Sequence, residues 1–585
     1  MLLFVSYQND AINVAASLLQ HSITLSKITG QISMDNTLTI FSEHQTIIEL
    51  AFMNIIHNNL VFEGLCYVPE ISSLSDFELF LHVNDVKIPC NIYRAKVKDE
   101  VKDGKVCKKA IGFSGTIPDY RLHSKMTITF HLHHQKHEPD KILLTTGTFF
   151  PVTQSIKNAY AYRNGYIFTL KENVIYAAKS GIIEHAKKEL LFLKELALLK
   201  TKYHKKAIAA RCFYHIANLF KKKEMWLISD RINMADDNGE ALFKYLNEKK
   251  TPENIYFIIR KDSADYDRIR KTGKVLVYNS IKHKLFHLLA DATVSSAFDR
   301  YVKTPYNSMY FQDILSLQKH ILLQHGVAQN NYTAWMNKFN GNFSMIVTSS
   351  VPEYNSFLHA DYYYDESVIK LTGMPRYDRL FDDKKKIITI MPTWRSGLTD
   401  KTKLAQYKID GKHRYKKEDF TDSKYYHFYN SLLNNELLLK KAEEYGYSLQ
   451  FMPHPNIIPY IDWFTKSKNV QFCSQETSYR NIFAESALIV TDYSSVAFDF
   501  AYLRKPVLYC QFDRGEFHFS KGYFNYERDG FGEVTYNLND IIGCIIDYME
   551  HDCVLKKEYR DRIEHFFAFH DKNNCKRVYE AIKTL

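Results

Sequence analysis

The chain has 585 residues, which is too long for one hydrophobic core and predicts roughly three or four domains of about 150 residues each. Hydrophobic residues make up 45% of the chain and aromatic residues 14%, with only 14 Pro and 21 Gly, so extended disorder is not expected. Lys and Arg total 77 against 66 Asp and Glu, and this net charge of +11 favours polyanionic partners such as nucleic acid, anionic lipid or phosphate polymers.

The cysteines and the first residues bear on the compartment. The nine cysteines show no CxxC pair or regular spacing, which argues against a zinc site or a disulfide framework and favours a reducing cytoplasm. The sequence MLLFVSYQNDAINVAASLL lacks a basic amino-terminal region and is interrupted by Gln8, Asn9 and Asp10, so we do not expect a signal peptide. No stretch approaches the roughly 20 uncharged apolar residues that span a bilayer. Any membrane association is therefore expected to be peripheral.

Residues 1–180 alternate apolar and polar side chains in the manner of β-strands, as in NTLTIFSEH, FELFLHVNDV and KMTITFHLHH. This pattern predicts a mostly β, sandwich-like amino-terminal domain without a catalytic motif. Four histidines in it are interpreted as the polar face of a strand and its turn, with metal binding the less favoured alternative: His131, His133, His134 and His137.

From 181 to 223 the pattern becomes helical, with leucines set among many lysines. A basic amphipathic helix suits an anionic lipid surface, because its apolar stripe inserts and each nearby Lys adds on the order of 1 kcal/mol. The same stripe also fits the core-facing side of a linking helix. The sequence supports both interpretations equally.

In the remaining chain, apolar strand-like runs alternate with amphipathic helices. The runs are MWLISD, NIYFIIR, KVLVYN, ADATVSSAF, HILLQHG, SMIVTSS and VIKLTGM, followed by IITIMPTW, YSLQFMPHP, ALIVTDYSS and PVLYCQF. Such alternation predicts two parallel sheets covered by helices, with ligands at the carboxyl ends of the strands. We therefore predict a two-lobed α/β enzyme with lobes at 224–380 and 381–585. The segment leading to Tyr415 and Lys416 is expected to hold the passage between the lobes and a surface insertion.

Each predicted lobe places a histidine at the end of a strand. In ILLQHGVAQNN the strand ends at His325, and Gly326 allows another group to approach the backbone closely. In YSLQFMPHPN the strand ends at His454, whose backbone is stiffened by Pro453 and Pro455. Each lobe is therefore expected to present one imidazole to the cleft.

A phosphate site is predicted where ALIVTDYSSVAFDF passes from strand to helix. The strand ends at Thr491 and Asp492, and Ser494 and Ser495 begin the helix. A helix start offers free backbone N–H groups and the positive end of a dipole, which together can hold a pyrophosphate without a metal.

Two arginines complete the predicted cleft, Arg376 in LTGMPRYDRL and Arg395 in IMPTWRSG, each after a predicted strand. Guanidinium groups bind phosphate oxygens bidentately and do not lose their charge. A lone histidine is usually a packing residue, and DYSS alone can be a simple helix cap. Their recurrence at successive strand ends is what indicates a site.

The combination of WLISDRINMADDNGEALFKYL, QHG, GMPR, MPTWR, MPHP and TDYSSVAFDF resembles the CDP-glycerol glycerophosphotransferase family. This family includes teichoic acid primases and polymerases that use CDP-glycerol or CDP-ribitol. The resemblance covers about residues 222–583 and does not extend to the β-rich region. It implies a GT-B-like fold, in which an acceptor-side Rossmann-like lobe at 224–380 and a CDP-polyol-binding lobe at 381–585 face a central cleft.

By this resemblance, the expected reaction moves glycerol phosphate or ribitol phosphate from a CDP-polyol to a hydroxyl of a lipid-linked or polymeric acceptor. It releases CMP and serves the synthesis of teichoic acid or a capsule-type polymer.

No cofactor or metal is expected, since Asp265 and Asp267, the nearest approach to a DxD motif, lie in a helix-like charged run. The expected location is cytoplasmic, peripheral on the inner face of the membrane, with an anionic membrane surface as partner. Nucleic acid is not expected as a partner, because the basic residues are dispersed and no nucleic-acid module is present.

The resemblance also implies roles for individual residues. His325 matches a general base acting on the acceptor hydroxyl, and His454 a histidine beside the donor pyrophosphate. The predicted donor-binding set is Gly326, Arg376, Thr393, Trp394, Arg395, Met452, Pro453, Asp492, Ser494, Ser495 and Asp499. Within this set, Ser494 and Ser495 match a phosphate-binding serine pair and Asp499 a donor-binding carboxylate, while Met452 and Pro453 are placed along the cytosine. The acceptor-side loop is placed at Asp237, Asn238, Gly239 and Glu240.

Elementary chemistry agrees with two imidazoles in this site. Attack of a polyol hydroxyl on the β-phosphate of a CDP-polyol requires removal of the hydroxyl proton, which is weakly acidic, and stabilisation of the charge on the departing CMP. One neutral and one protonated imidazole suit these two tasks. Two alternatives remain: a GT-B glycosyltransferase that uses a nucleotide sugar, and a non-catalytic polymer-binding protein. Release of UDP would favour the first, and the intact histidines and serine pair argue against the second.

Overall fold

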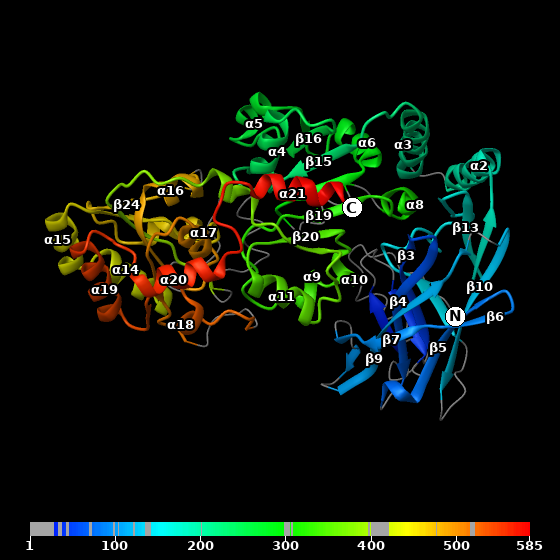
Figure 1. Ribbon diagram of the computed structural model, residues 1–585, viewed down its shortest axis with the longest axis horizontal. Helices are drawn as coiled ribbons and strands as arrows, with labels where there is room; N and C mark the ends of the chain where they lie inside the picture. Colours follow the sequence, from blue (N-terminus) through cyan, green and yellow to red (C-terminus); the bar gives the residue numbers. More distant parts are fainter. Residues whose placement is uncertain are drawn as a thin grey trace, which may run out of the picture. The chain divides into compact units, whose positions relative to one another are not determined.

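The computed structural model describes residues 28–32, 38–42, 46–69, 73–96, 100–102, 105–120, 123–134, 142–199, 202–297, 305, 308–395, 398, 420–474, 477–514 and 521–585. These residues form two compact units, the first within Met1–Ile216 and Tyr306–Leu317, the second within Ala217–Pro305 and Gln318–Leu585. Figure 1 shows the elements of both units. The expected insertion near Tyr415 and Lys416, and also His137, lie outside the described residues.

The first unit is built on two packed β-sheets. One has the strand order β12-β13-β14-β10-β5-β6 and the other β11-β3-β4-β9-β7, with β8 paired to β9. The bounds are β3 (Ile47–Ile56), β4 (Asn59–Pro69), β5 (Phe77–Val83), β6 (Val86–Pro89), β7 (Asn91–Arg94), β8 (Glu100–Lys102), β9 (Lys105–Ile117), β10 (Lys125–His134), β11 (Leu143–Thr146), β12 (Ala161–Arg163), β13 (Tyr166–Lys171) and β14 (Val174–Lys179). A separate antiparallel pair is formed by β1 (Ile28–Ile32) and β2 (Leu38–Ser42), and η2 (Leu74–Asp76) precedes β5.

Aromatic side chains fill the space between the two sheets. Phe62 of β4 and Phe113 of β9 pack edge-on against Phe130 of β10, with ring centroids 6.2 and 5.6 Å apart. On the same strand β10, Leu132 is buried whereas His131 and His133 are exposed. The predicted mostly β region is therefore confirmed, and these two histidines lie on a polar strand face.

Two helices follow the sandwich, α2 (Ile182–Leu198) and α3 (Lys202–Leu219), and α8 (Gln312–Leu315) with η5 (Ser308–Tyr310) belongs to the same unit. The Gly181 N–H at the start of α2 donates to the Glu184 carboxylate at 3.2 Å, which closes the first turn. The inner face of α2 carries Glu189, Phe192 and Leu196. Among the described residues, no helix has both the length and the hydrophobicity needed to cross a bilayer.

The second unit contains two parallel sheets with the strand order of a doubly wound fold. The first has the order β17-β16-β15-β18-β19-β20-β21 and the second β24-β23-β22-β25-β26-β27. Every pairing in them is parallel. In chain order each sheet reads 3-2-1-4-5-6, with a seventh strand at the edge of the first. The predicted GT-B-like fold with two Rossmann-like lobes is confirmed.

The strands of the first sheet are β15 (Met225–Ser229), β16 (Asn254–Ile259), β17 (Val275–Val277), β18 (Ala292–Ser295), β19 (Lys319–Leu322), β20 (Met345–Thr348) and β21 (Ile369–Leu371). Those of the second are β22 (Ile387–Ile390), β23 (Ser448–Phe451), β24 (Val470–Phe472), β25 (Ser486–Thr491), β26 (Val507–Cys510) and β27 (Val534–Thr535).

The helices around the first sheet are α4 (Asn238–Glu248), α5 (Tyr266–Thr272), α6 (Ile281–Leu289), α9 (Thr333–Met336), α10 (Lys338–Gly341), α11 (Val351–His359) and η6 (Pro375–Arg379). Around the second are α14 (Lys424–Leu433), α15 (Glu436–Tyr445), η8 (Ile458–Trp463), α16 (Tyr479–Glu485), α17 (Val496–Tyr502), α18 (Tyr526–Asp529), α19 (Leu538–Glu550) and α20 (Lys557–Phe566).

The last helix, α21 (Asn574–Lys583), lies against the first sheet, beside α4 and β15 (Figure 1). Its buried side chains Cys575, Val578 and Ile582 join the core that contains Trp226 and Phe257. Their spacing of three and four residues gives one apolar helix face. The sequence placed 381–585 in the second lobe, whereas this terminal helix completes the core of the first.

The strand order of each sheet reverses at one point, between β15 and β18 in the first and between β22 and β25 in the second. Loops that follow strands on either side of such a point run in opposite directions and leave a crevice at the carboxyl ends. The predicted functional residues follow β15, β19, β22, β23 and β25, so most of them lie at these two crevices.

Candidate active site

His325 leaves the first sheet in a tight, strongly anchored turn just after β19. The preceding Gln324 has φ +60°, a left-handed conformation that a non-glycine residue rarely adopts. Its side-chain amide donates to the Val347 carbonyl at 2.5 Å and to the Glu353 carboxylate at 3.0 Å. Gln324 is buried and His325 is exposed. The turn therefore presents the imidazole at the surface of the lobe while its own backbone is fixed in the core.

Gly326 brings this turn against the second lobe. A Cβ added at Gly326 would overlap the Ser495 Oγ and lie 3.0 Å from the Ser495 Cβ, so glycine allows this close approach without displacing the Ser495 side chain. Beside it, the Gln329 side chain donates to the Tyr493 carbonyl at 2.7 Å and accepts from the Tyr526 hydroxyl at 3.1 Å. The His325 turn therefore contacts the β25–α17 segment that carries the predicted phosphate-binding serines.

His454 lies after β23 in the second lobe. Its Nδ1 accepts a hydrogen bond from the Asn456 backbone N–H at 3.2 Å, so a neutral ring carries its proton on Nε2. The Trp394 ring lies 6.1 Å away between centroids. Met452 and Pro453, predicted to lie along a cytosine, are both buried, and Met452 is part of the core of this lobe.

Asp492 organises the crevice of the second sheet. One of its carboxylate oxygens accepts from the Thr393 N–H at 2.9 Å and from the Thr393 hydroxyl at 2.5 Å. Arg395 pairs with Asp492 at 2.9 Å and with Asp513 at 2.5 Å. Burial alone lowers the pKa of Arg395, but these two carboxylates raise it further than burial lowers it, so the guanidinium is charged. Arg395 therefore holds Asp492 and Asp513 together at this crevice. Its contact with donor phosphate stays a prediction.

The serine pair lies where it was predicted. Ser495 is the residue before α17, and the Ser494 Oγ accepts from the Val496 N–H at 3.4 Å. Both residues are half-buried. Gly326 approaches Ser495, Asp492 of the same β25–α17 segment binds Thr393, and the Trp394 ring that follows Thr393 lies beside His454.

Arg376 connects the two lobes. Its guanidinium donates to both oxygens of Asp499 on α17, at 2.5 and 2.8 Å, and to the Asp237 carboxylate at 2.5 Å. Burial opposes the charge, whereas Asp499 and Asp237 raise the pKa of Arg376 well above its ordinary value. The sequence assigned Arg376 and Asp499 separately to the donor, and the structure brings them together as an ion pair. Their contact with a donor stays a prediction.

The predicted acceptor-side loop forms the start of α4. Asp230, at the end of β15, accepts from the backbone N–H groups of Gly239 at 2.7 Å and Glu240 at 3.0 Å. Burial and the neighbouring Asp237 raise the pKa of Asp230 to about 7. The Asn238 side-chain amide donates to the Gln324 carbonyl at 2.8 Å, so the loop is joined directly to the His325 turn.

Sequence reasoning missed several residues that build this site. Glu353 is fully buried and anchors the His325 turn, while Asp230, Gln329 and Asp513 hold neighbouring segments. The only sequence signal for Glu353 was Ser350-x-x-Glu353 at the start of α11, which predicts a helix cap. That pattern contains nothing about the distant turn that the carboxylate also binds.

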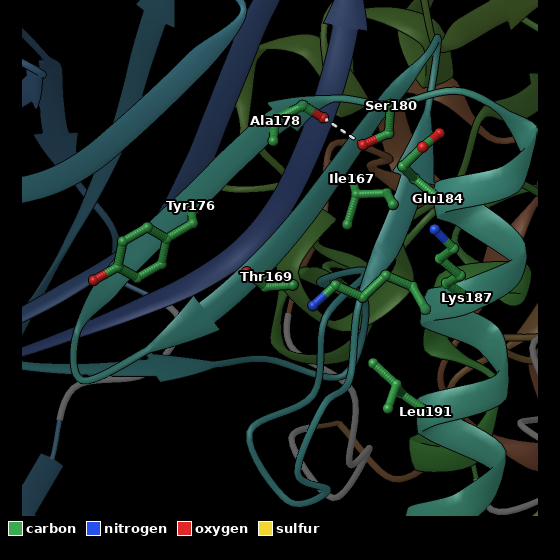
Figure 2. A pocket seen from close by; sticks show the side chains of 9 residues that line it. Ile167, Thr169, Tyr176, Ala178, Ser180, Glu184, Lys187 and Leu191 are labelled. Atoms are coloured by element: carbon green, nitrogen blue, oxygen red, sulfur yellow. Dashed lines mark hydrogen bonds between the residues drawn. The ribbon is translucent and has the colours of Figure 1, made fainter.

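Figure 2 shows a cavity of about 360 Å³ in the first unit, between β13, β14 and the first turns of α2. Thr169, Tyr176, Lys187 and Leu191 are among its lining residues. None of the predicted transferase residues line it. Among the side chains that the structure describes, no three His, Cys, Asp or Glu residues are grouped as metal ligands would be.

Comparison with known proteins places these features in a family. The sequence profile described as CDP-glycerol:poly(glycerophosphate) glycerophosphotransferase matches residues 210–584. The chain belongs to this family. The match covers both lobes, including α21, and begins within α3.

Two curated relatives and a solved structure illustrate the relationship. The minor teichoic acid biosynthesis protein GgaB of Bacillus subtilis (strain 168) is 37% identical over 521 residues, which cover 87% of this chain and 57% of that protein. The teichoic acid poly(glycerol phosphate) polymerase of the same organism is 23% identical over 376 residues, 59% of this chain and 46% of that protein. A variant of the wall teichoic acid polymerase TagF has a TM-score of 0.49 at 16% identity, covering 69% of this chain and 98% of that chain. The chain spans about half the length of the curated relatives it matches.

Proposed function

We propose that this chain transfers glycerol phosphate or ribitol phosphate from a CDP-polyol to a hydroxyl of a lipid-linked or polymeric acceptor and releases CMP. Family membership supports a glycerophosphotransferase. The observation that carries the proposal is the contact between Gly326 and Ser495, because it brings the turn of His325 against the segment predicted to hold the donor diphosphate.

On the acceptor side, His325 takes the proton. An acceptor hydroxyl attacks the phosphorus that bears the polyol, a new P–O bond forms, and the hydroxyl proton passes to the imidazole. Because the side chain is exposed, a large polymeric acceptor can reach it. General-base assistance of this kind contributes about 10²–10⁴-fold to a rate.

On the donor side, the bond between the two phosphates breaks and CMP leaves with the electron pair. The half-buried His454 suits this step, because its Nδ1 accepts the Asn456 N–H and the proton of the neutral ring is therefore on Nε2. In this proposal, Nε2 donates that proton in a hydrogen bond to the departing phosphate. Ser494 and Ser495 supply hydroxyl donors at the start of α17. Fixed donors placed where charge develops stabilise the transition state with little reorganisation.

A donor panel tests the reaction class. With CDP-glycerol, CDP-ribitol and a set of UDP-sugars over a lipid-linked acceptor, we expect release of CMP from one of the CDP-polyols and no release of UDP. We expect the rate to persist in EDTA, since two imidazoles and fixed donors supply the proton transfer and charge stabilisation. Release of UDP, or a strict requirement for Mg²⁺ or Mn²⁺, would contradict this proposal.

We further propose that helix α2 attaches the chain to an anionic membrane surface on the cytoplasmic side. Opposite its buried face, α2 carries a stripe of exposed residues, defined here as the α2 stripe: Ile183, Lys187, Leu190, Lys194 and Leu198. Leu190 is 67% exposed and Leu198 59% exposed. Apolar side chains that alternate with lysines suit the boundary between lipid headgroups and acyl chains.

Vesicle sedimentation tests this attachment. Replacing both stripe lysines, as in Lys187→Ala with Lys194→Ala, is expected to weaken binding to phosphatidylglycerol vesicles by roughly 30-fold at low salt, at about 1 kcal/mol per Lys. Leu190→Gln should also weaken binding, whereas Leu437→Gln, at a 54% exposed leucine on α15, should not. Equal binding by all variants, or equal binding to phosphatidylcholine vesicles, would argue against the α2 stripe as the contact.

A further inference from the structure

We infer that Glu353 and Gln324 are positioning residues for His325: a buried carboxylate clamps both sides of the turn that carries the imidazole. This inference rests on the proposed function, because it assigns the clamp to the general base of that reaction. Neither residue touches the predicted donor site directly. Their effect on catalysis would therefore act through the geometry of His325.

The clamp has two halves, one on each oxygen of the Glu353 carboxylate. Oε1 accepts from the Gln324 side chain at 3.0 Å and from the Ala328 backbone N–H at 2.8 Å, so it binds the chain on both sides of His325. Oε2 accepts from the Ser349 N–H at 2.7 Å and the Ser349 hydroxyl at 3.1 Å, just after β20. One side chain thereby ties the turn after β19 to the end of the neighbouring strand β20.

Gln324 is held from three directions. Its amide donates to Glu353 and to the Val347 carbonyl, and its own carbonyl accepts from the Asn238 side chain at 2.8 Å. Its left-handed backbone costs on the order of 1 kcal/mol or more in a non-glycine residue. Such a conformation persists only where surrounding contacts fix it, and here those contacts converge on the residue next to the proposed base.

Burying a carboxylate at this position costs desolvation free energy, which a purely structural role would not require. Glu353 has no exposed surface, and its four hydrogen-bond donors are two backbone N–H groups, a hydroxyl and an amide, with no cation among them. Burial raises the pKa of Glu353, while these donors oppose that rise. Four donors directed at one acceptor fix its place closely, and a displacement of about 1 Å in a catalytic group can cost on the order of 100-fold in rate.

Two variants test the inference. Glu353→Gln keeps the shape but turns one acceptor into a donor that faces existing donors. Gln324→Gly removes the anchored side chain while glycine adopts the same backbone without strain, so this variant carries the test if Glu353→Gln does not fold. In steady-state assays of CMP release at varied donor concentration, we expect each to lower kcat about 10- to 100-fold with donor KM changed less than about 3-fold. Glu253→Gln, at another buried carboxylate of the same unit, is the matched control and should leave kcat unchanged.

A double-mutant cycle with His325→Ala separates positioning from general structural damage. If the clamp acts through the imidazole, adding Glu353→Gln or Gln324→Gly to His325→Ala should lower activity less than about 3-fold further. Multiplicative losses, a rise in KM at constant kcat, or kcat values equal to the Glu253→Gln control would overturn the positioning role. Full activity in His325→Ala would remove His325 as the proposed general base, whereas no release of CMP by the unchanged protein from either CDP-polyol would remove the proposed function, so the failures are distinguishable.

Discussion

Replacing either histidine by alanine, His325→Ala or His454→Ala, is expected to lower the rate of CMP release by at least about 100-fold. The reason is that each imidazole has a separate proton to handle, one on the attacking hydroxyl and one near the departing phosphate, and general acid–base assistance typically contributes 10²–10⁴-fold. The rates are to be measured with saturating CDP-polyol and a lipid-linked acceptor, together with thermal unfolding of each variant.

The control is His359→Ala, at an exposed histidine at the end of α11, which should retain the full rate. Both active-site variants should unfold near the temperature of the unchanged protein, because His325 is exposed and His454 only half-buried. Near-normal CMP release in both variants would refute the two-imidazole mechanism. Loss in only one of them would leave a single general acid–base group and require another source of charge stabilisation at the second position.

The two roles also predict different sensitivity to the leaving group. A donor analogue whose departing nucleotide is a weaker base needs less assistance as it leaves, so the deficit of His454→Ala should shrink with it. The deficit of His325→Ala concerns the acceptor proton and should persist. The ratio of rates for two donors in each variant therefore tests the assignment of each histidine without further structural work.

The fold was largely predictable from local sequence pattern. Each buried strand of a parallel sheet is a short apolar run, which can be recognised in the sequence without knowing which strands lie beside it. The positions of His325, His454 and Ser494 after their strands followed from that pattern and from the rule that ligands bind at carboxyl ends. The α21 helix was misplaced for a physical reason. Its apolar face at Cys575, Val578 and Ile582 predicts burial but carries no information on which sheet it will cover.

Partners that are distant in sequence were the main part that could not be predicted. An arginine that follows a strand predicts phosphate binding from sequence even where the folded chain pairs it with carboxylates. Only the fold shows that Arg376 binds Asp499, 123 residues away. Glu353 illustrates the same limit, because a helix-cap pattern explains its sequence context while its carboxylate serves another turn. Residues that hold a site are thus harder to find from sequence than residues that face the ligand.

The largest stability effect is expected in the first unit, at the buried group formed by Arg211, Glu189 and Asp313. Arg211 has no exposed surface and donates to Glu189 at 2.8 and 2.6 Å and to Asp313 at 2.8 Å. Glu189→Gln should cost about 3–5 kcal/mol of unfolding free energy, because it leaves part of a buried charge uncompensated. Arg211→Met should cost more, since it leaves two carboxylates facing each other. The free energy of unfolding is measured by urea denaturation, with hydrogen exchange of the backbone amides in α2 and α3 as the probe.

The same group predicts how this unit responds to acid. Burial raises the pKa of Glu189, but the hydrogen bonds from Arg211 and the close approach of the His215 ring lower it by more, so the folded value lies below that of an unfolded carboxyl group. The stability that this pair contributes is therefore complete above about pH 4.5 and is lost as the pH falls toward the folded value. Glu189→Gln should flatten the loss of stability below about pH 4.5, whereas Glu195→Gln, at a less buried residue of α2, should keep it. An unchanged acid profile in Glu189→Gln would show that other carboxylates control the acid unfolding of α2 and α3.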